Sequence, residues 1–297
     1  MKVIRITDGL GNQMFQYAFA LSLQKMTGEE VYLDRTWFPE YGGKLRNAVR
    51  RVYGLDVFQL SINEYVTAET SHDIIYGEGL MGKLNEFLHL RPGLLREGKH
   101  PLGLPELGGY VGKNKVFRGF FQQASYAEFA REDLLVEFRI DDAVLDAPNL
   151  DMLAQIRAAG ECAVAVHVRR GDYVNAATQS VFGLCSADYY ARAARIVADK
   201  VGKTPHLFVF SDDPEWVRND FRSDFPLTAV DINSPDTGHL DINLMRHCHH
   251  AITANSTFSW WGAWLIPHDD AVVVSPEKWF ASSGRAEELQ PSRWILA

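Results

Sequence analysis

Residues Ala163–Val174 read AVAVHVRRGDYV, and this stretch decides the fold class. Its valine-rich apolar start is typical of a strand that is buried on both faces. The run then ends on charged side chains, among them His167, Arg169, Arg170 and Asp172. Burying two guanidinium groups is costly without an anion beside them, so the stretch predicts a strand that delivers arginines to an anionic ligand. An internal ion pair, such as Arg170 with Asp172, is the alternative that stays open.

Strand-like and helical patterns alternate on the C-terminal side of the chain. The predicted strands are CAVAVHV, HLFVFS, LTAVDI, AITA and AVVVS, and the predicted helices lie in SADYYARAARIVADKVG, PEWVRNDF, DINLMRHCHH and STFSWWGAWLI. This alternation predicts an α/β fold with a parallel sheet, in which ligands bind at the carboxyl ends of the strands. The charged end of the opening stretch would lie at that edge.

The N-terminal side begins as another α/β unit. KVIRIT and VYLD are predicted strands, and the helix between them is predicted to end at Gly28. The pattern loosens over 38–112 and resumes as a strand and a helix in KVFRGFFQQASYAEF. The Gly- and Pro-rich segment EGKHPLGLPELGGYVGK is not expected to be regular structure. DDAVLDAPNLDMLAQIRAAG is the candidate linker, so we expect domains at 1–150 and 151–297.

Composition narrows the classes of partner. The chain has 297 residues, 46% hydrophobic residues and a formal net charge of -8. This charge argues against nucleic acid or an anionic membrane surface as the main partner, since either favours a basic face. Three widely spaced cysteines fit a reducing compartment. The N-terminus lacks the apolar core of a signal peptide, and no apolar run approaches the roughly 20 residues that span a bilayer. We therefore expect a soluble cytoplasmic protein.

A second group of polar residues lies in AITANSTFSWWGAWLIP, where a short strand precedes a helix. Asn255, Ser256 and Thr257 occupy the junction. They are natural helix caps, but hydroxyls and free N–H groups at the positive end of a helix also make an anion site. Together with the arginines they suggest a phosphate clamp. The tryptophans of this helix are expected to pack in the core rather than to stack on a sugar.

Two further patterns imitate metal sites. In FSDDPEW, Asp212 and Asp213 precede a proline, and a helix cap explains them more simply than a metal does. In RHCHH, only His247 and His250 would share a face of a helix, and two ligands do not make a zinc site. We expect no metal site.

A glycine-rich turn, DGLGNQMFQ, follows the first predicted strand. Its glycine and polar residues include Gly9, Gly11, Asn12 and Gln13. With Asp34 after the second strand, the turn imitates a dinucleotide-binding fold, although Met14 stands in place of the third glycine. It supplies the rival hypothesis of an NAD(P)-dependent oxidoreductase that contacts the ribose through Asp34. A sugar-binding protein without catalysis is the other alternative.

Taken together, GLGNQMFQYAFA, GFFQQASY, HVRRGDYV, FVFSDDPEWV and ANSTFSWWGAWL resemble, in this order, the motif set of the bacterial α-1,2-fucosyltransferases of glycosyltransferase family 11. The resemblance runs from Gly9 to about Pro276. It implies a GT-B fold with two Rossmann-like domains facing a cleft, residues 1–150 on the acceptor side and residues 151–297 binding GDP-L-fucose. It further implies a terminal β-galactoside as acceptor, inversion at the anomeric carbon, and no metal or other cofactor.

The resemblance also assigns site residues. Arg169 corresponds to an arginine that binds the β-phosphate of the donor, and Asp241 to an acid that holds guanine, whose N1–H and N2–H a carboxylate can accept. The implied donor-binding set is His167, Arg169, Arg170, Asp241, Asn255, Ser256, Thr257 and Phe258. The residues implied to line the cleft from the N-terminal domain are Gly9, Gly11, Asn12 and Gln13.

One departure concerns the general base. A related α-1,6-fucosyltransferase group carries a glutamate a few residues beyond the arginine motif, where this chain has Ala177. Asp172 is left as the candidate base, with Arg169 as the second catalytic residue. The implied partners are GDP-fucose and a galactose-terminated oligosaccharide or lipid-linked glycan of the cell surface, such as an O-antigen. This leaves room for peripheral contact with the inner face of the membrane.

Overall fold

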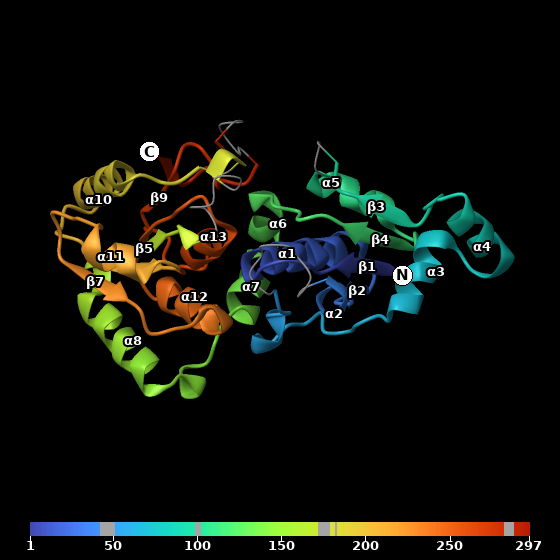
Figure 1. Cartoon of the computed structure of the whole chain (residues 1–297), viewed down its shortest axis with the longest axis horizontal. Coiled ribbons are helices and arrows are strands. Elements are labelled where there is room, and N and C mark those ends of the chain that lie inside the picture. Colours follow the sequence, from blue (N-terminus) through green and yellow to red (C-terminus); the bar gives the residue numbers. More distant parts are fainter. Residues whose placement is uncertain (42–50, 99–101, 172–178, 182, 282–287) are drawn as a thin grey trace. The chain divides into compact units, whose positions relative to one another are not determined.

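The structure is a computed structural model that describes residues 1–41, 51–98, 102–171, 179–181, 183–281 and 288–297 (Figure 1). The chain forms two compact units, Met1–Phe138 and Arg139–Ala297. Each unit is built around its own sheet, and every strand pair in both sheets is parallel. The predicted α/β class with two Rossmann-like units is therefore confirmed.

Unit 1 carries a sheet of order β2-β1-β4-β3. Its strands are β1 (Lys2–Arg5), β2 (Val31–Asp34), β3 (Leu94–Arg96) and β4 (Lys115–Arg118). Its α-helices are α1 (Leu10–Thr27), α2 (Trp37–Tyr41), α3 (Ala68–Tyr76), α4 (Gly79–Phe87), α5 (Leu104–Leu107), α6 (Ala124–Phe129) and α7 (Arg131–Glu137). As predicted, α1 ends at Gly28, which adopts the left-handed conformation with φ of 67°.

Helices cover both faces of the unit 1 sheet. Val116 packs against Ile75 of α3, whereas the next residue of β4, Phe117, meets Phe19 of α1 edge to face. Because successive side chains of a strand point to opposite faces, α1 and α3 lie on opposite sides of the sheet. The loose region 38–112 thus contains α3, α4 and β3, which the sequence pattern did not predict, and α5 is a short helix within its Gly- and Pro-rich segment.

Unit 2 carries a sheet of order β10-β9-β8-β5-β6-β7. Its strands are β5 (Ala163–Val168), β6 (His206–Ser211), β7 (Leu227–Val230), β8 (His250–Ile252), β9 (Val273–Ser275) and β10 (Ile295–Leu296). Its α-helices include α8 (Ala147–Ala159), α10 (Ala187–Val201), α11 (Pro214–Asn219), α12 (Gly238–Arg246) and α13 (Thr257–Trp264). The five strands and four helices predicted on this side of the chain are all present: β6 has the predicted bounds, α12 and β8 begin earlier than predicted, and the other elements are shorter.

The opening stretch forms β5, which lies between β8 and β6. Val164, Val166 and Val168 pack with α10 and α11, and the alternate residues face the side of α13. Figure 1 shows α10 and α12 on either side of β5. Burial on both faces explains why the strand is almost continuously apolar.

The predicted linker is wrong. Residues 147–159 form α8, and the two units divide between Phe138 and Arg139 rather than at 150. Asp146 caps the helix by accepting a hydrogen bond from the N–H of Asn149 at 3.1 Å, and Pro148 lies in its first turn. Asp, Pro and Asn occur in loops as well as at helix starts, so the sequence pattern does not distinguish a linker from the start of α8.

The three cysteines of the chain, Cys162, Cys185 and Cys248, are free thiols. Among the helices that the structure describes, none combines the length and the apolar character needed to cross a bilayer.

Candidate functional site

Part of the predicted donor-binding set lies at the carboxyl edge of the unit 2 sheet. Strands β6 and β7 follow on one side of β5, while β8, β9 and β10 lie on the other, so the strand order switches between β5 and β8. Ligands of such sheets bind outside the carboxyl ends at this switch point. His167 near the end of β5 and Phe258 at the start of α13, after β8, contact each other there with ring centroids 5.2 Å apart.

His167 is a buried, neutral imidazole. Burial lowers the pKa of His167 to about 4; nearby Asp212 opposes this shift, while Arg169 adds to it. Its Nδ1 atom is buried and has no hydrogen-bond partner among the described residues. A buried ring nitrogen without a partner is costly, and a ligand group at this edge would satisfy it.

Arg169 is held by a carboxylate from the neighbouring strand. Its Nη1 lies 2.9 Å from Oδ2 of Asp212, and Oδ1 of Asp212 accepts a hydrogen bond from the backbone N–H of Arg170 at 2.8 Å. A Cβ atom on Gly171 would come within 2.5 Å of the same carboxylate, which explains the glycine of the RRGD motif. A guanidinium has five N–H donors, so one carboxylate orients Arg169 without using all of them.

Arg170 is turned toward α11 instead. Its Nε donates to Oδ2 of Asp213 at 3.2 Å, and its guanidinium carbon lies 4.4 Å from the ring centroid of Trp216. Asp213 also caps α11 by accepting from the N–H of Trp216 at 3.1 Å. The predicted helix cap is confirmed for Asp213. Asp212 instead pairs with Arg169 and accepts a hydrogen bond from the backbone N–H of Arg170. The alternative hypothesis of an internal ion pair is therefore confirmed for Arg170, and its partner is Asp213.

We expect Arg170→Gln to act mainly on stability, because the side chain packs on α11. Loss of the ion pair and of the cation–π contact should cost about 1 kcal/mol of unfolding free energy. Urea unfolding measures this cost, and turnover should change much less than in Arg169→Ala. A loss of turnover as large as that of Arg169→Ala would show that Arg170 contacts the substrate itself.

The start of α13 is not capped by the side chain predicted to do so. Ser256 occupies the N-cap position but makes no side-chain cap hydrogen bond. Asn255 is buried, and its Nδ2 donates to the carbonyl of Trp279 at 3.2 Å. Thr257 opens the helix. The uncapped first turn suits an anion, since the N–H groups at a helix start lack intrahelical partners.

The tryptophans of α13 belong to the core, as predicted. Trp260, Trp261 and Trp264 are almost fully buried, and Nε1 of Trp260 donates to the carbonyl of Leu289 at 2.7 Å. They therefore form no exposed platform for a sugar.

Asp241 lies in the first turn of α12, beside the same edge. A Cβ atom on Gly238, the first residue of α12, would stand 3.2 Å from the ring of Phe258, so the two helix starts are in contact. One carboxylate oxygen of Asp241 accepts from Nδ2 of Asn233 at 2.7 Å. Burial raises the pKa of Asp241 to about 6, against the opposing effect of Asn233. The carboxylate is thus partly desolvated, as a group that reads hydrogen-bond donors in a ligand should be.

The candidate base Asp172 lies outside the described residues, as does Ala177. The sequence analysis did not predict that Arg169 pairs with Asp212. The register Val168↔Ser211 between β5 and β6 was the signal that could have revealed it, because the residues that follow these two strands are then neighbours.

In unit 1 the glycine-rich turn is tied to other segments. Gly9 is the N-cap of α1, and Gly11 is buried in its first turn. Oδ1 of Asn12 accepts from Nε2 of Gln122 at 2.8 Å, which joins the turn to the GFFQQ motif. Gln13 is buried and has a structural role that the sequence did not predict. It donates to the carbonyls of Asp8 and Val52 at 2.8 and 2.9 Å and accepts from the N–H of Gly54 at 2.9 Å.

Gln13→Ala should therefore destabilise unit 1. It leaves three backbone groups without their partner, and the cost should be about 2–3 kcal/mol in urea unfolding. Gln155→Ala, at an exposed position of α8, is the matched control and should change the unfolding free energy little. Equal effects of the two substitutions would mean that the hydrogen bonds of Gln13 contribute nothing.

The environment of Asp34 does not fit the hypothesis of a dinucleotide-binding site. This residue is fully buried. Its Oδ1 accepts from the N–H and hydroxyl of Thr36 at 2.9 and 2.6 Å, and its Oδ2 accepts from the hydroxyl of Ser71 at 3.0 Å. No accessible oxygen remains for the hydroxyls of a ribose, so the rival oxidoreductase hypothesis loses its key residue.

The histidine-rich segment is divided between two elements. His247 follows the end of α12, and His250 begins β8. The expectation that they share a helix face is therefore wrong. The described part of the chain holds no group of three or more His, Cys, Asp or Glu side chains arranged for a metal ion.

Comparison with known proteins gives a consistent picture. Residues 107–296 match the model of Glycosyl transferase family 11. The chain is 30% identical to the O-antigen biosynthesis glycosyltransferase WbnK of Escherichia coli, over 98% of each protein. It is also 30% identical to the alpha-1,2-colitosyltransferase of Escherichia coli, over 99% of this chain and 97% of that protein. The galactoside 2-alpha-L-fucosyltransferase Sec1 of Mus musculus is 23% identical, over 99% and 73%.

Solved structures are more distant. Fucosyltransferase NodZ from Bradyrhizobium has a TM-score of 0.42 at 14% identity, covering 90% of this chain and 93% of NodZ. ADP-heptose lps heptosyltransferase II of E. coli has a TM-score of 0.43 at 14% identity, covering 100% and 90%.

Proposed function

Because the chain belongs to glycosyl transferase family 11, we propose that it moves L-fucose from GDP-L-fucose to the 2-hydroxyl of a terminal β-galactoside. The new linkage is α-1,2, and the reaction inverts the anomeric carbon. The names of its relatives support a role in O-antigen or other cell-surface glycan synthesis. The observation that carries the proposal is the meeting of His167, Phe258 and the start of α12 at the switch point of unit 2, with Arg169 following His167 at the end of β5.

Unit 2 binds the donor in this proposal. Asp241 accepts the N1–H and N2–H groups of guanine, since both are donors that a carboxylate pairs with well. Arg169 and the first turn of α13 hold the pyrophosphate through a planar fork and backbone N–H groups. His167 supplies an uncharged contact to the donor.

The chemistry follows from what the leaving group needs. When the bond between fucose and the β-phosphate breaks, GDP gains negative charge, and donors fixed in place stabilise that charge without reorganising. Asp212 fixes Arg169 for this task. The transition state is oxocarbenium-like, so it asks less of a base on the acceptor hydroxyl. Asp172 takes that proton in the proposal.

Unit 1 provides the acceptor side. The acceptor is a galactose-terminated oligosaccharide or a lipid-linked glycan, and the enzyme acts in the cytoplasm, in peripheral contact with the inner face of the membrane. Gly9, Gly11 and Asn12 line the acceptor side in this proposal, whereas the hydrogen bonds of Gln13 are already used within unit 1.

A second candidate differs only in the sugar. Colitose is the 3,6-dideoxy counterpart of a hexose, and a relative named for colitose transfer is as similar to this chain as the O-antigen enzyme. In this alternative the enzyme uses GDP-colitose with the same nucleotide contacts.

Measuring the release of the nucleoside diphosphate separates the candidates. The purified chain is incubated with a β-galactoside acceptor and either GDP-fucose or GDP-colitose. Faster turnover with GDP-fucose supports the main proposal, and faster turnover with GDP-colitose selects the alternative. Turnover with UDP-sugars and none with GDP-sugars would reject both.

Activity should persist in excess EDTA, because the proposal stabilises the leaving group with Arg169 and backbone N–H groups. The rate of fucose transfer is compared before and after chelation, and after adding Mg²⁺ or Mn²⁺. Loss of activity on chelation, with recovery on adding either ion, would contradict the proposal that Arg169 and backbone N–H groups stabilise the leaving group.

A further inference from the structure

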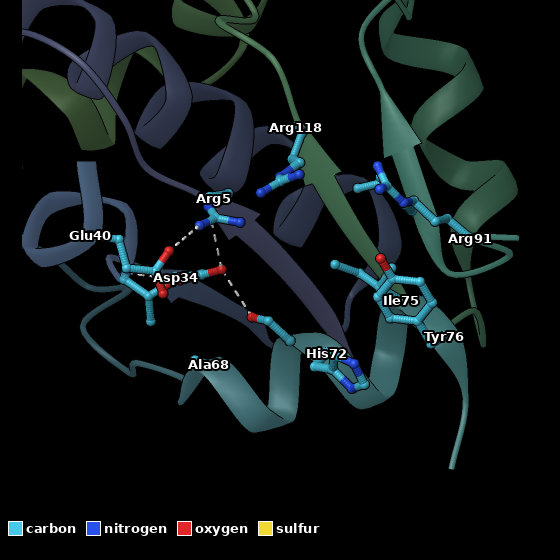
Figure 2. A pocket seen from close by; sticks show the side chains of 12 residues that line it. Arg5, Asp34, Glu40, Ala68, His72, Ile75, Tyr76, Arg91 and Arg118 are labelled. Atoms are coloured by element: carbon cyan, nitrogen blue, oxygen red, sulfur yellow. Dashed lines mark hydrogen bonds and ion pairs between the residues drawn. The ribbon is translucent and has the colours of Figure 1, made fainter. Parts of the chain in front are cut away.

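Unit 1 contains a pocket rich in arginine, at the carboxyl edge of its own sheet. Its volume is about 220 Å³, and it lies between the ends of β1, β2 and β4 and the helix α3. Figure 2 shows the side chains of Arg5, Arg91 and Arg118 at this pocket, with Asp34 and Glu40 beside Arg5. None of the residues predicted for the fucosyltransferase site lines it, whereas Asp34, the ribose contact of the rival hypothesis, does.

The two carboxylates of the pocket lie near one of its arginines. Nη2 of Arg5 is 3.4 Å from Oε2 of Glu40, and Nε of Arg5 is 3.9 Å from Oδ2 of Asp34. Asp34 already accepts hydrogen bonds from Thr36 and Ser71. The acidic groups of the pocket therefore balance Arg5 and leave little capacity for the other two guanidinium groups.

Arg118 and Arg91 have no carboxylate partner among the described residues. Arg91 lies only over the ring of Tyr76, at 6.0 Å from its centroid. Arg118 directly follows Phe117, the register partner of Ile4, and so lies beside Arg5 on the adjacent strand. Like charges side by side across two strands repel each other. An anion between them would remove this repulsion.

The side chain of Arg5 is a second, independent indication of an anionic ligand in the pocket. Its side chain is only 11% exposed, and its Nε is buried without a hydrogen-bond partner within the described residues. The 3.9 Å separation from Asp34 is too long for a hydrogen bond. A buried charged donor left without an acceptor is costly, and a ligand oxygen in the pocket would satisfy it.

We propose that this pocket binds the anionic group of a charged sugar, either a carboxylate or a phosphate. Arginine forks match both groups through paired hydrogen bonds. The volume is below the roughly 300–1,000 Å³ of pockets for drug-sized ligands, so it suits one small group. Ile75, Tyr76 and Leu94 also line the pocket and add apolar surface beside the anionic group. The inference concerns unit 1 alone and does not rest on the donor site in unit 2.

Binding of three small probes to the whole chain tests the inference. Glucuronate carries a carboxylate, glucose 6-phosphate carries a phosphate, and glucose is the neutral control. Each is titrated by calorimetry or ligand-observed NMR in the presence of excess GDP, which occupies the proposed donor site. We expect at least one charged probe to bind about tenfold or more tightly than glucose. The charged probe that binds more tightly shows whether the anionic group is a carboxylate or a phosphate.

Variants place the binding in the pocket. Arg118→Gln and Arg91→Gln should each weaken the charged probe about tenfold while keeping the melting temperature of the protein. Lys83→Gln is the matched control, because Lys83 is exposed on α4 and does not line the pocket. The inference is overturned if glucose binds as well as the charged probes, if both pocket variants bind like the wild type, or if Lys83→Gln weakens binding equally. Failure to bind GDP would instead count against the proposed function.

Discussion

Arg169→Ala is expected to lower the turnover number for fucose transfer by about 100-fold or more, the scale seen when one donor to a transition state is removed. The substitution removes the fork at the β-phosphate. It also leaves Asp212, its partner at 2.9 Å, as an uncompensated negative charge near the leaving group. Arg169→Lys should recover little, because an ammonium cannot reproduce a planar fork. Steady-state kinetics at saturating donor measures the loss.

A second substitution separates these two causes. In Arg169→Ala combined with Asp212→Asn, the extra negative charge is gone, while the asparagine oxygen can still accept from the N–H of Arg170. The double variant should be more active than Arg169→Ala alone and far less active than the wild type. If the Arg169→Ala variant folds normally and keeps most of its activity, the proposal that Arg169 stabilises the leaving group is refuted.

Asp241→Asn should lower the affinity for GDP by about 100-fold and leave the affinity for ADP unchanged. Each hydrogen bond from guanine to the carboxylate is worth roughly 1.5–3 kcal/mol, and two of them are lost or weakened. Calorimetry with GDP, UDP and ADP measures the three affinities. Equal affinities in the wild type, or a preference for UDP, would refute the guanine assignment.

The pH dependence gives an independent check on Asp241. Its pKa is raised to about 6 by burial, and only the ionised carboxylate can accept both guanine donors. The preference for GDP over ADP should therefore be constant at higher pH and fall as the pH drops through 6, by at most about tenfold per unit. Taking the ratio cancels the titration of the phosphates, which GDP and ADP share. In Asp241→Asn the ratio should not change with pH.

The core of unit 2 could be predicted because its pattern is strong. β5 is buried on both faces and reads as an apolar run, and α10 has caps at both ends, Ser186 and Gly202. The helix α8 was missed because its start carries Asp and Pro, which also mark loops. β10 has two residues and depends on its pairing with β9, so no local pattern reveals it.

The site could be predicted only in part. Motifs identified Arg169 and His167, and parallel strands placed them at a carboxyl edge. Which carboxylate holds Arg169 depended on the register of β5 with β6, and two of the three hydrogen bonds of Gln13 depended on a segment about 40 residues further along the chain. The arginine pocket of unit 1 likewise combines residues from β1, β4 and the segment after α4. Such contacts between distant segments leave no periodic signal in the sequence.

The most direct test of the central claim is the linkage in the purified product. The chain is incubated with GDP-fucose and a glycan ending in β-galactose, and the product is analysed by NMR. The account predicts a single fucose in the α-configuration on O2 of the terminal galactose. A β-linked fucose, or fucose on any other hydroxyl of the glycan, would contradict it.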